Sequence, residues 1–289
     1  MTPEAHPGAT ARTRVAVPSR GRLRDECLNL LGRAGFDTSM LRGGGSIASL
    51  GALELLEMRP RDAAAALAAG QLAGAFLATD IVMEFALEEL TALPLGFSRS
   101  DLVLASRDDD GRRAPSDLEG GVIATHLPRL TERFLAVEGV KATVVAMGGS
   151  LEGVCAAGLA DAIVDLRETG TSLLQNRLRV LRTLRRCEAL FVRHDEQPHL
   201  DDLVLRLGGV LSARLHRYVM LHVPADRLEA LGRVFHGLAS PTVLPLAGRD
   251  DLKAVHFVVP AEELWARLSD LRALGATGIV ALEPHALLP

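Results

Sequence analysis

Short apolar runs alternate with amphipathic helical segments along the first third of the chain. Patterns typical of buried strands occur at residues 14–17, 53–58 and 72–77, and a stretch with helical spacing of its apolar residues follows each of them. The second of these helices is rich in alanine and closes at Gly70. Strands that alternate with helices predict a parallel sheet covered by helices, the α/β class.

The same alternation begins again after a run of charge at residues 107–113, which we interpret as a solvated loop. Apolar strands are predicted at residues 122–125, 142–145 and 160–166, with helical patterns between them. Two such α/β lobes place a ligand at the carboxyl ends of the strands of both. We therefore expect the chemistry in a cleft between two lobes.

The order of elements changes after residue 213 to strand, helix, strand, strand, helix, strand. This is the order of a split βαβ, or ferredoxin-like, α+β module. The module offers no nucleophile or acid pair, so regulation or assembly is its expected role. The predicted domains are a disordered tail at 1–13, a first catalytic domain at 14–101 with 186–212, a second catalytic domain at 102–185, and a regulatory domain at 213–289.

Composition adds limits to this picture. With 289 residues, 48% of them hydrophobic, the chain is long enough for two or three separate cores. The formal net charge is −4 without a basic block, so nucleic acid is not an expected partner, and no segment is apolar enough for a membrane span. Three widely spaced cysteines predict neither a disulfide framework nor a metal site and suit a cytoplasmic location.

The most informative segment is a buried strand that runs into a polar turn, GLADAIVDLRETGTS from Gly158. Backbone N–H groups of such a turn point at one spot, and Gly170 allows a ligand to approach the backbone closely. A phosphate monoester fits this turn, and Asp165 at the end of the strand is placed to hold ribose hydroxyl groups. The alternative is a helix N-cap with nothing bound. The turn consists of Glu168, Thr169, Gly170, Thr171 and Ser172.

A second junction of strand, turn and helix carries two cations, Arg20 and Arg22. Guanidinium groups bind phosphate through two parallel hydrogen bonds, so these side chains would suit a polyanion. The alternative is that both are solvated loop arginines. The histidines between His126 and His285 follow no metal-ligand spacing, and we interpret them as surface or core residues rather than catalytic bases.

Seven separated motifs are VAVPSRGRL at Val15, RPRD at Arg59, IATHLP at Ile123, GGSLE at Gly148, GLADAIVDLRETGTS at Gly158, SPTVLPL at Ser240 and LGATGIVAL at Leu274. Together they resemble the long form of ATP phosphoribosyltransferase, the first enzyme of histidine biosynthesis, over nearly the whole chain. The resemblance implies a periplasmic-binding-protein-like catalytic region with two lobes and an ACT-like, ferredoxin-like domain that binds histidine as a feedback inhibitor. It also implies dependence on Mg²⁺ and assembly into homo-oligomers, either dimers or hexamers.

The resemblance further implies a role for each motif. The turn at residues 168–172 would bind the 5-phosphate of phosphoribosyl pyrophosphate, with Asp165 near its ribose. Arg20, in place of the lysine usual in the family, and Arg59 would lie over the pyrophosphate and triphosphate, and Glu152 matches the acid of the family's GSVE motif. The remaining expected residues are Arg22, Asp80 and Leu127 for ATP. For the effector we expect His222, which closes the first strand of the last module, together with Ser240, Thr242, Ala276 and Thr277. The alternative for these residues is ordinary turn chemistry around Pro241.

The implied reaction is a direct transfer in which N1 of adenine attacks the ribosyl C1 while Mg²⁺ and cations stabilise the departing pyrophosphate. No metal ligands are assigned.

Two departures from the family pattern concern the acceptor. Residues 73–78 read AGAFLA where the family reads roughly DLGITG, and Leu127 stands where an aromatic side chain often precedes the proline. Base stacking on an aromatic ring contributes about 1–3 kcal/mol, so the affinity for adenine is expected to change. The turn at residues 168–172 is intact, so the donor is expected to be unchanged while the acceptor can differ. Two alternatives therefore remain open. One is a diverged paralogue with the same donor in a purine-derived natural-product pathway of the coformycin type, and the other is a non-catalytic nucleotide-binding regulatory subunit.

Overall fold

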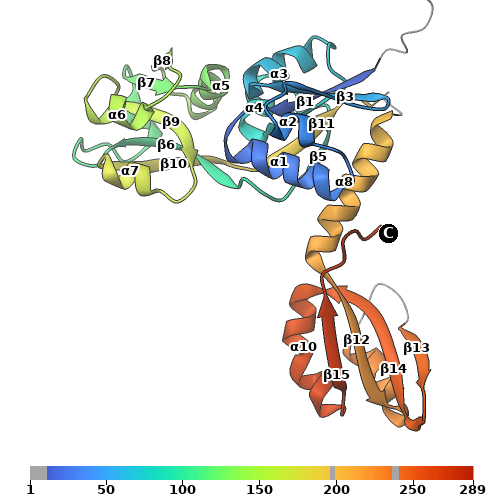
Figure 1. The fold of residues 1–289 in the computed structure, drawn as a ribbon. Coiled ribbons are helices and arrows are strands. Elements are labelled where there is room, and N and C mark those ends of the chain that lie inside the picture. The colour runs from blue at the N-terminus through green and yellow to red at the C-terminus, as the bar shows by residue number, and fades with distance from the viewer. Residues whose placement is uncertain (1–11, 196–198, 236–240, 289) are drawn as a thin grey trace, which may run out of the picture. The chain divides into compact units, whose positions relative to one another are not determined.

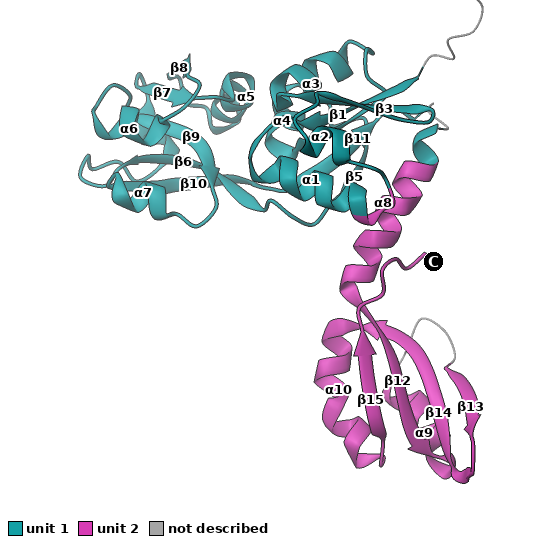
Figure 2. Ribbon diagram, viewed as in Figure 1, with its two compact units in different colours: residues 1–32, 36–201 teal, residues 33–35, 202–289 magenta. Residues whose placement is uncertain are grey.

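The computed structural model describes residues 12–195, 199–235 and 241–288 (Figure 1). The chain divides into two compact units, the first formed by residues 1–32 and 36–201 and the second by residues 33–35 and 202–289 (Figure 2). Most of the predicted tail lies outside the described residues, and Thr13 already belongs to the first strand. None of the described helices is both long and apolar enough to cross a membrane.

The first lobe of unit 1 is built on a six-stranded sheet with the order β2-β3-β1-β4-β11-β5. Its first strand is parallel to β3 and β4, so their carboxyl ends lie at one edge. The strands are β1 (Thr13–Pro18), β2 (Ile47–Leu50), β3 (Leu53–Met58), β4 (Gly74–Ala78), β5 (Thr91–Pro94) and β11 (Ala189–Arg193), and the helices are α1 (Gly21–Arg33), α2 (Ser39–Arg42), α3 (Pro60–Ala68) and α4 (Thr79–Glu84).

The second lobe contains a five-stranded sheet with the order β10-β6-β9-β7-β8. Only Glu188 separates β10 from β11, so the chain passes there from the second sheet directly back into the first. The strands are β6 (Ser100–Arg107), β7 (Val122–Thr125), β8 (Thr143–Ala146), β9 (Ala162–Arg167) and β10 (Leu178–Cys187), and the helices are η1 (Pro115–Leu118), α5 (Pro128–Glu138), α6 (Leu151–Ala156) and α7 (Thr171–Gln175).

The two sheets are mixed, which corrects the prediction of parallel sheets. β11 is antiparallel to β4 and β5, and β6 is antiparallel to β9 and β10. The strands β2, β5, β10 and β11 were not predicted. β2, β5 and β10 are edge strands of their sheets, and such strands lack the continuous apolar run of a strand buried on both faces. β10 in particular alternates leucines with arginines.

Tight packing holds the returning strand β11 against β4. A Cβ atom at Gly74 would lie 2.8 Å from the ring Cζ of Phe191, so glycine is required for this approach. The rings of Phe76 and Phe191 pack with centroids 4.9 Å apart. One apolar core cluster contains side chains of both sheets, including Leu77 of the first and Val164 of the second. The two lobes of unit 1 are therefore joined by packed core as well as by connecting strands.

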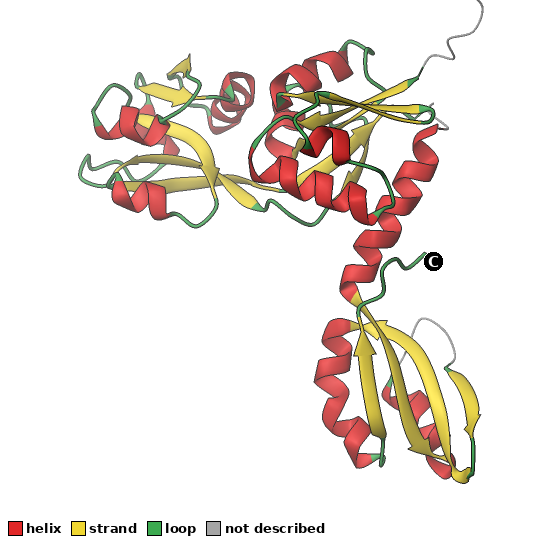
Figure 3. Cartoon of the chain, viewed as in Figure 1, coloured by secondary structure: helices red, strands yellow, loops and turns green. Residues whose placement is uncertain are grey.

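Unit 2 confirms the predicted ferredoxin-like module (Figure 3). Its sheet has the antiparallel order β13-β14-β12-β15, and α9 and α10 contact each other. Residues 202–212, which we placed with the first catalytic domain, group with this unit. The elements are α8 (His199–Leu215), β12 (His216–Pro224), η2 (Ala225–Arg227), α9 (Leu228–Val234), β13 (Thr242–Leu246), β14 (Arg249–Pro260), α10 (Ala261–Ala273) and β15 (Thr277–Leu282).

Candidate active site

A histidine and two aspartates from both lobes meet where strands of the two sheets end. His126 follows β7, Asp165 lies near the end of β9, and Asp80 follows β4 at the start of α4. The Nδ1 atom of His126 lies 3.5 Å from Oδ1 of Asp165, and its Nε2 atom lies 3.8 Å from Oδ2 of Asp80. The structure thus brings together two predicted site residues through a histidine that no sequence pattern had singled out.

Asp80 is buried and Asp165 is partly buried. Asp80 is only 2% exposed, and its Oδ1 atom has no hydrogen-bond partner within the described residues. Burial raises the pKa of Asp165, and the charges of Glu152 and Asp80 act in the same direction. The backbone N–H of Leu166, which donates to Asp165 over 2.8 Å, and the charge of His126 oppose this rise only in part. The two carboxylates therefore have fewer hydrogen-bond donors and less positive charge around them than their negative charges require.

The ring of His126 can supply the opposite charge when it is protonated. Burial lowers the pKa of its imidazole, but the contact with Asp80 and the negative charges of Asp165 and Asp80 raise it by more. Arg61 lowers the pKa of His126, and the net result is a pKa above the ordinary value. The acids therefore favour the protonated ring.

A second contact between the lobes supports the turn that carries His126. The guanidinium group of Arg61 donates to the backbone oxygen of His126 and lies 3.7 Å from Oε1 of Glu84. Glu84, only 2% exposed, accepts hydrogen bonds from the backbone N–H groups of Leu130 at 2.9 Å and Arg129 at 3.4 Å. A carboxylate of α4 in the first lobe thus caps the first turn of α5 in the second.

The predicted phosphate turn has the backbone that such a turn requires. Gly170 has φ of 81°, a left-handed conformation that favours glycine. The hydroxyl groups of Thr169 and Thr171 lie 3.1 Å apart, and the hydroxyl of Ser172 donates to the carboxylate of Glu152 on α6. The turn and the predicted acid Glu152 are therefore neighbours.

The turn also reaches the first lobe. Arg22, near the start of α1, donates two hydrogen bonds of 2.8 and 3.0 Å to the carboxylate of Glu168. We had placed Arg22 with ATP and Glu168 with the donor, and the structure shows that they contact each other. Both side chains are about half exposed, so the pair is accessible to a competing anion.

Arg20 and Arg59 lie at one edge of the first sheet. They follow the paired strands β1 and β3, and the N–H of Ser19 donates to the oxygen of Met58 over 3.0 Å. Both arginine residues are exposed, and within the described residues neither side chain forms a hydrogen bond or ion pair. Two guanidinium groups without partners at the carboxyl ends of neighbouring parallel strands are suited to a diphosphate.

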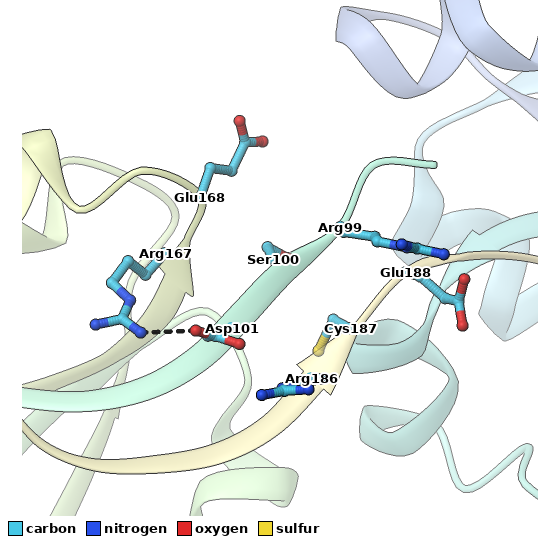
Figure 4. Close-up of a pocket in the computed structure, with 8 residues that line it drawn as sticks. All are labelled: Arg99, Ser100, Asp101, Arg167, Glu168, Arg186, Cys187 and Glu188. Carbon is cyan, nitrogen blue, oxygen red and sulfur yellow. Dashed lines mark hydrogen bonds and ion pairs between the residues drawn. The ribbon is translucent and has the colours of Figure 1, made fainter. Parts of the chain in front are cut away.

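A cavity of about 400 Å³ lies beside the phosphate turn (Figure 4). Its lining comes from the start of β6, the junction of β10 and β11, and the end of β9. Arg167 is paired there with Asp101 at 2.6 Å, whereas Arg99 and Arg186 form no such pair with any described residue. The lining residues are Arg99, Ser100, Asp101, Arg167, Glu168, Arg186, Cys187 and Glu188, of which only Glu168 was predicted.

Leu127 does not line the site. Its side chain is fully buried in the apolar core, so it cannot contact a base in this arrangement. The chain turns here so that His126 meets the aspartates while Leu127 packs inward, with its N–H bonded to the hydroxyl of Thr125 at 3.0 Å. The unusual segment at residues 73–78 is likewise core, because Ala75, Phe76 and Leu77 are at most 1% exposed.

The expected effector residues are only partly brought together. His222 of β12 pairs with Thr277 of β15, next to Ala276. Thr242 lies on β13, which β14 separates from β12, so it is two strands away from His222. Ser240 lies outside the described residues.

Comparisons with known proteins find relatives that match almost the whole chain. A family model described as ATP phosphoribosyltransferase matches residues 59–209, and a model described as the HisG C-terminal domain matches residues 213–284. Two curated proteins named ATP phosphoribosyltransferase, from Gemmatimonas aurantiaca and Natronomonas pharaonis, are each 36% identical to this chain over 96% of its length, covering 99% and 100% of those relatives. The solved ATP phosphoribosyl transferase (HisG:HisZ) complex from Thermotoga maritima contains a chain with 26% identity and a TM-score of 0.59, covering 68% of this chain and 96% of that one.

Proposed function

The chain belongs to the ATP phosphoribosyltransferase family, and we propose how its residues carry out that family's reaction. The reaction transfers the phosphoribosyl group of phosphoribosyl pyrophosphate to N1 of ATP and releases pyrophosphate, the first step of histidine biosynthesis. The observation that supports our assignment of residues is one juxtaposition. The turn at 168–172 and Asp165 in the second lobe face Arg22 and Asp80 of the first.

The donor binds to the second lobe in this proposal. Backbone N–H groups and hydroxyls of the turn hold the 5-phosphate, and Gly170 permits the close approach. Asp165 accepts hydrogen bonds from the ribose hydroxyls. Because burial raises the pKa of this carboxyl, donors supplied by a bound ribose would stabilise its charged form. Ser172 and Glu152 are already joined by a hydrogen bond, so the acid is placed to contact the same sugar.

The diphosphate lies toward the first lobe, where Arg20 and Arg59 have no ion-pair partner among the residues that the structure describes. Negative charge develops on the leaving pyrophosphate as the C1–oxygen bond breaks, and these guanidinium groups stabilise it. N1 of adenine supplies the electron pair of the new bond to C1. No covalent intermediate with the protein is required, so positioning and charge stabilisation are the main tasks of the site.

Mg²⁺ fits this site as an ion bound through the diphosphate of the substrate rather than through a set of protein ligands. Within the part of the chain that the structure describes, no group of three or more histidine, cysteine or acidic side chains is arranged to hold a metal. Mg²⁺ commonly keeps several water ligands and binds through substrate phosphates. When bound with the donor, it would neutralise charge on the leaving group.

ATP enters from the first lobe in this proposal, with Arg22 toward its phosphates. Asp80 is only 2% exposed, so it is left out of the contacts with the base. Arg22 is held by Glu168 before the substrates bind, which keeps a cation beside the turn. Leu127 is left out of the acceptor site because it is buried. No described residue favours the paralogue or the non-catalytic subunit over this function, since the altered segment at 73–78 belongs to the core.

Feedback by histidine is proposed for unit 2, at His222, Ala276 and Thr277. Pairing of β12 with β15 places these residues together. Homo-oligomer formation is proposed as well, as a dimer or hexamer. The Thermotoga maritima relative was solved as a HisG:HisZ complex, so a second kind of chain is the alternative that size measurement of the purified protein must exclude.

An acceptor competition tests the proposed function. The protein is supplied with phosphoribosyl pyrophosphate, Mg²⁺ and an equal mixture of ATP, GTP, ITP and free adenine, and the products are identified by mass spectrometry. We expect phosphoribosyl-ATP as the dominant product. Exclusive ribosylation of another purine would overturn ATP as acceptor and would favour the diverged paralogue.

A further inference from the structure

We propose that His126 is a positioning residue: as an imidazolium it bridges Asp80 of the first lobe and Asp165 of the second, and so holds Asp165 in place for the ribose. This inference rests on the proposed function of the site, because it assigns His126 to the same transfer. It does not make His126 a catalytic residue, since the ring contacts the aspartates rather than the substrate.

The first support is that Asp80 depends on His126. Among the described residues, His126 is the one cationic side chain within 4 Å of the Asp80 carboxylate. Asp80 is 2% exposed, and its other oxygen has no hydrogen-bond partner in the described part of the chain. A buried carboxylate without a compensating charge or donor is costly, and loss of one member of such a pair destabilises strongly.

The second support is the geometry of the ring between two acceptors. Nδ1 faces Asp165 and Nε2 faces Asp80. A neutral imidazole has a single N–H group and donates to only one acceptor, whereas the protonated ring donates from both nitrogens. The two contacts, at 3.8 and 3.5 Å, are ion-pair distances, and only the protonated ring offers both an N–H group and a positive charge to each carboxylate, so the bridge requires the protonated ring.

The third support is that the turn on which His126 sits is fixed from several sides. The hydroxyl of Thr125, which is fully buried, donates to the oxygen of Val164 over 2.8 Å and accepts the N–H of Leu127. Arg61 donates to the oxygen of His126 itself. Val164 directly precedes Asp165, so the backbones of the histidine and the aspartate are tied together.

The surrounding charges favour the protonated ring. Asp80 and Asp165 face His126 directly, Glu152 lies beyond Asp165, and Arg61 is the opposing cation. Glu84, 3.7 Å from Arg61, offsets part of that positive charge. The acids outnumber the cations around the ring, and the pKa of His126 is raised accordingly.

A dependence on pH follows with a definite sign. Below its raised pKa the ring is protonated and the bridge is complete. As pH rises through that pKa, His126 loses its proton and with it the charge attraction to both aspartates, and the transfer slows. Activity should therefore fall on the alkaline side because of His126.

The test compares pH profiles of kcat/KM for phosphoribosyl pyrophosphate. His126→Gln removes the titrating group, Asp80→Asn weakens the stabilisation of the charged ring, and His194→Gln is the matched control. His194 lies outside the cluster, with Nε2 3.0 Å from the oxygen of Leu67. We expect wild type and His194→Gln to share one alkaline limb and Asp80→Asn to show it at lower pH. His126→Gln should lack it and lose roughly ten- to a hundredfold in kcat/KM at neutral pH. An unchanged alkaline limb in His126→Gln would overturn the proposal.

A second measurement separates this proposal from the proposed function. The pKa of His126 is followed by NMR in protein with isotope-labelled histidine, and its signal is identified by absence from the folded His126→Gln variant. A His126 pKa above the ordinary histidine value that falls in Asp80→Asn supports the bridge even if ATP is not the acceptor. A pKa that Asp80→Asn leaves unchanged refutes the bridge even if phosphoribosyl-ATP is formed.

Discussion

Arg22 of the first lobe and Glu168 of the second are joined by two hydrogen bonds across the candidate active site, at 2.8 and 3.0 Å. Such a pair between half-exposed side chains contributes at most about 1 kcal/mol to stability. In the proposed site, the pair would instead hold a guanidinium group beside the turn at residues 168–172 before a substrate arrives. A mutation of this pair should therefore change substrate binding much more than the stability of the fold.

Replacement of Arg22 by alanine should raise the KM for ATP on the order of tenfold while the melting temperature changes little, because a phosphate contact is lost and the exposed pair is weak. Steady-state kinetics and thermal unfolding measure the two effects. Arg233→Ala is the control, since Arg233 is an exposed arginine of α9 that pairs with Glu229 away from the site. Equal effects of the two variants on KM would contradict the assignment.

Replacement of Asp165 by asparagine should abolish most activity without loss of stability. The carboxyl pKa is raised in the folded protein, so folding favours the protonated form and stability rises as pH falls through that pKa. Asparagine mimics the uncharged group, so the unfolding free energy should stay the same or increase while kcat/KM falls about a hundredfold or more. Urea unfolding and initial rates test this, and a destabilised variant would show that the charge of Asp165 supports the fold.

Replacement of Gly170 by alanine should weaken donor binding through the backbone. An added Cβ would lie 3.6 Å from Cδ of Arg167, an ordinary contact, so the cost is the left-handed conformation itself, about 1–2 kcal/mol. Gly248→Ala is the matched control, because Gly248 also has a left-handed backbone, with φ of 70°, and open space around it. Both variants should lose similar stability, whereas only Gly170→Ala should raise the KM for phosphoribosyl pyrophosphate. A normal KM in Gly170→Ala would remove the turn from the donor site.

Replacement of Glu84 by glutamine should loosen the contact between the lobes. The two carboxylate oxygens accept two backbone N–H groups of α5, and an amide offers only one acceptor oxygen, so one buried N–H loses its partner. We expect a loss of about 1–3 kcal/mol in urea unfolding. Glu88→Gln alters an exposed acid near Arg133 and should change stability by less than about 0.5 kcal/mol.

The sequence was sufficient to select candidate residues wherever they lie within a continuous motif. Asp165, Gly170 and the hydroxyls around them were selected as candidates because strand, turn and helix follow one another directly. The ferredoxin-like module was found because its alternation of elements is local as well. These inferences needed no knowledge of long-range contacts.

The rest depends on contacts between distant segments. His126 has no distinguishing pattern of its own, and its proposed role depends on the position of Asp80 on α4, opposite Asp165. Leu127 was assigned to the acceptor because of the motif, whereas the structure buries it. β10 and β11 were not predicted because they lead the chain from the second sheet back into the first, a connection that depends on long-range contacts. β10 is also an arginine-rich edge strand, without the continuous apolar run of a buried strand.

The most direct test of the central claim is a simultaneous measurement of pyrophosphate and phosphoribosyl-ATP in a reaction of wild type with phosphoribosyl pyrophosphate, ATP and Mg²⁺. We predict that the two products form in equal amounts and that Asp165→Asn suppresses both together. Pyrophosphate released without phosphoribosyl-ATP, or a donor that binds without either product, would contradict the account.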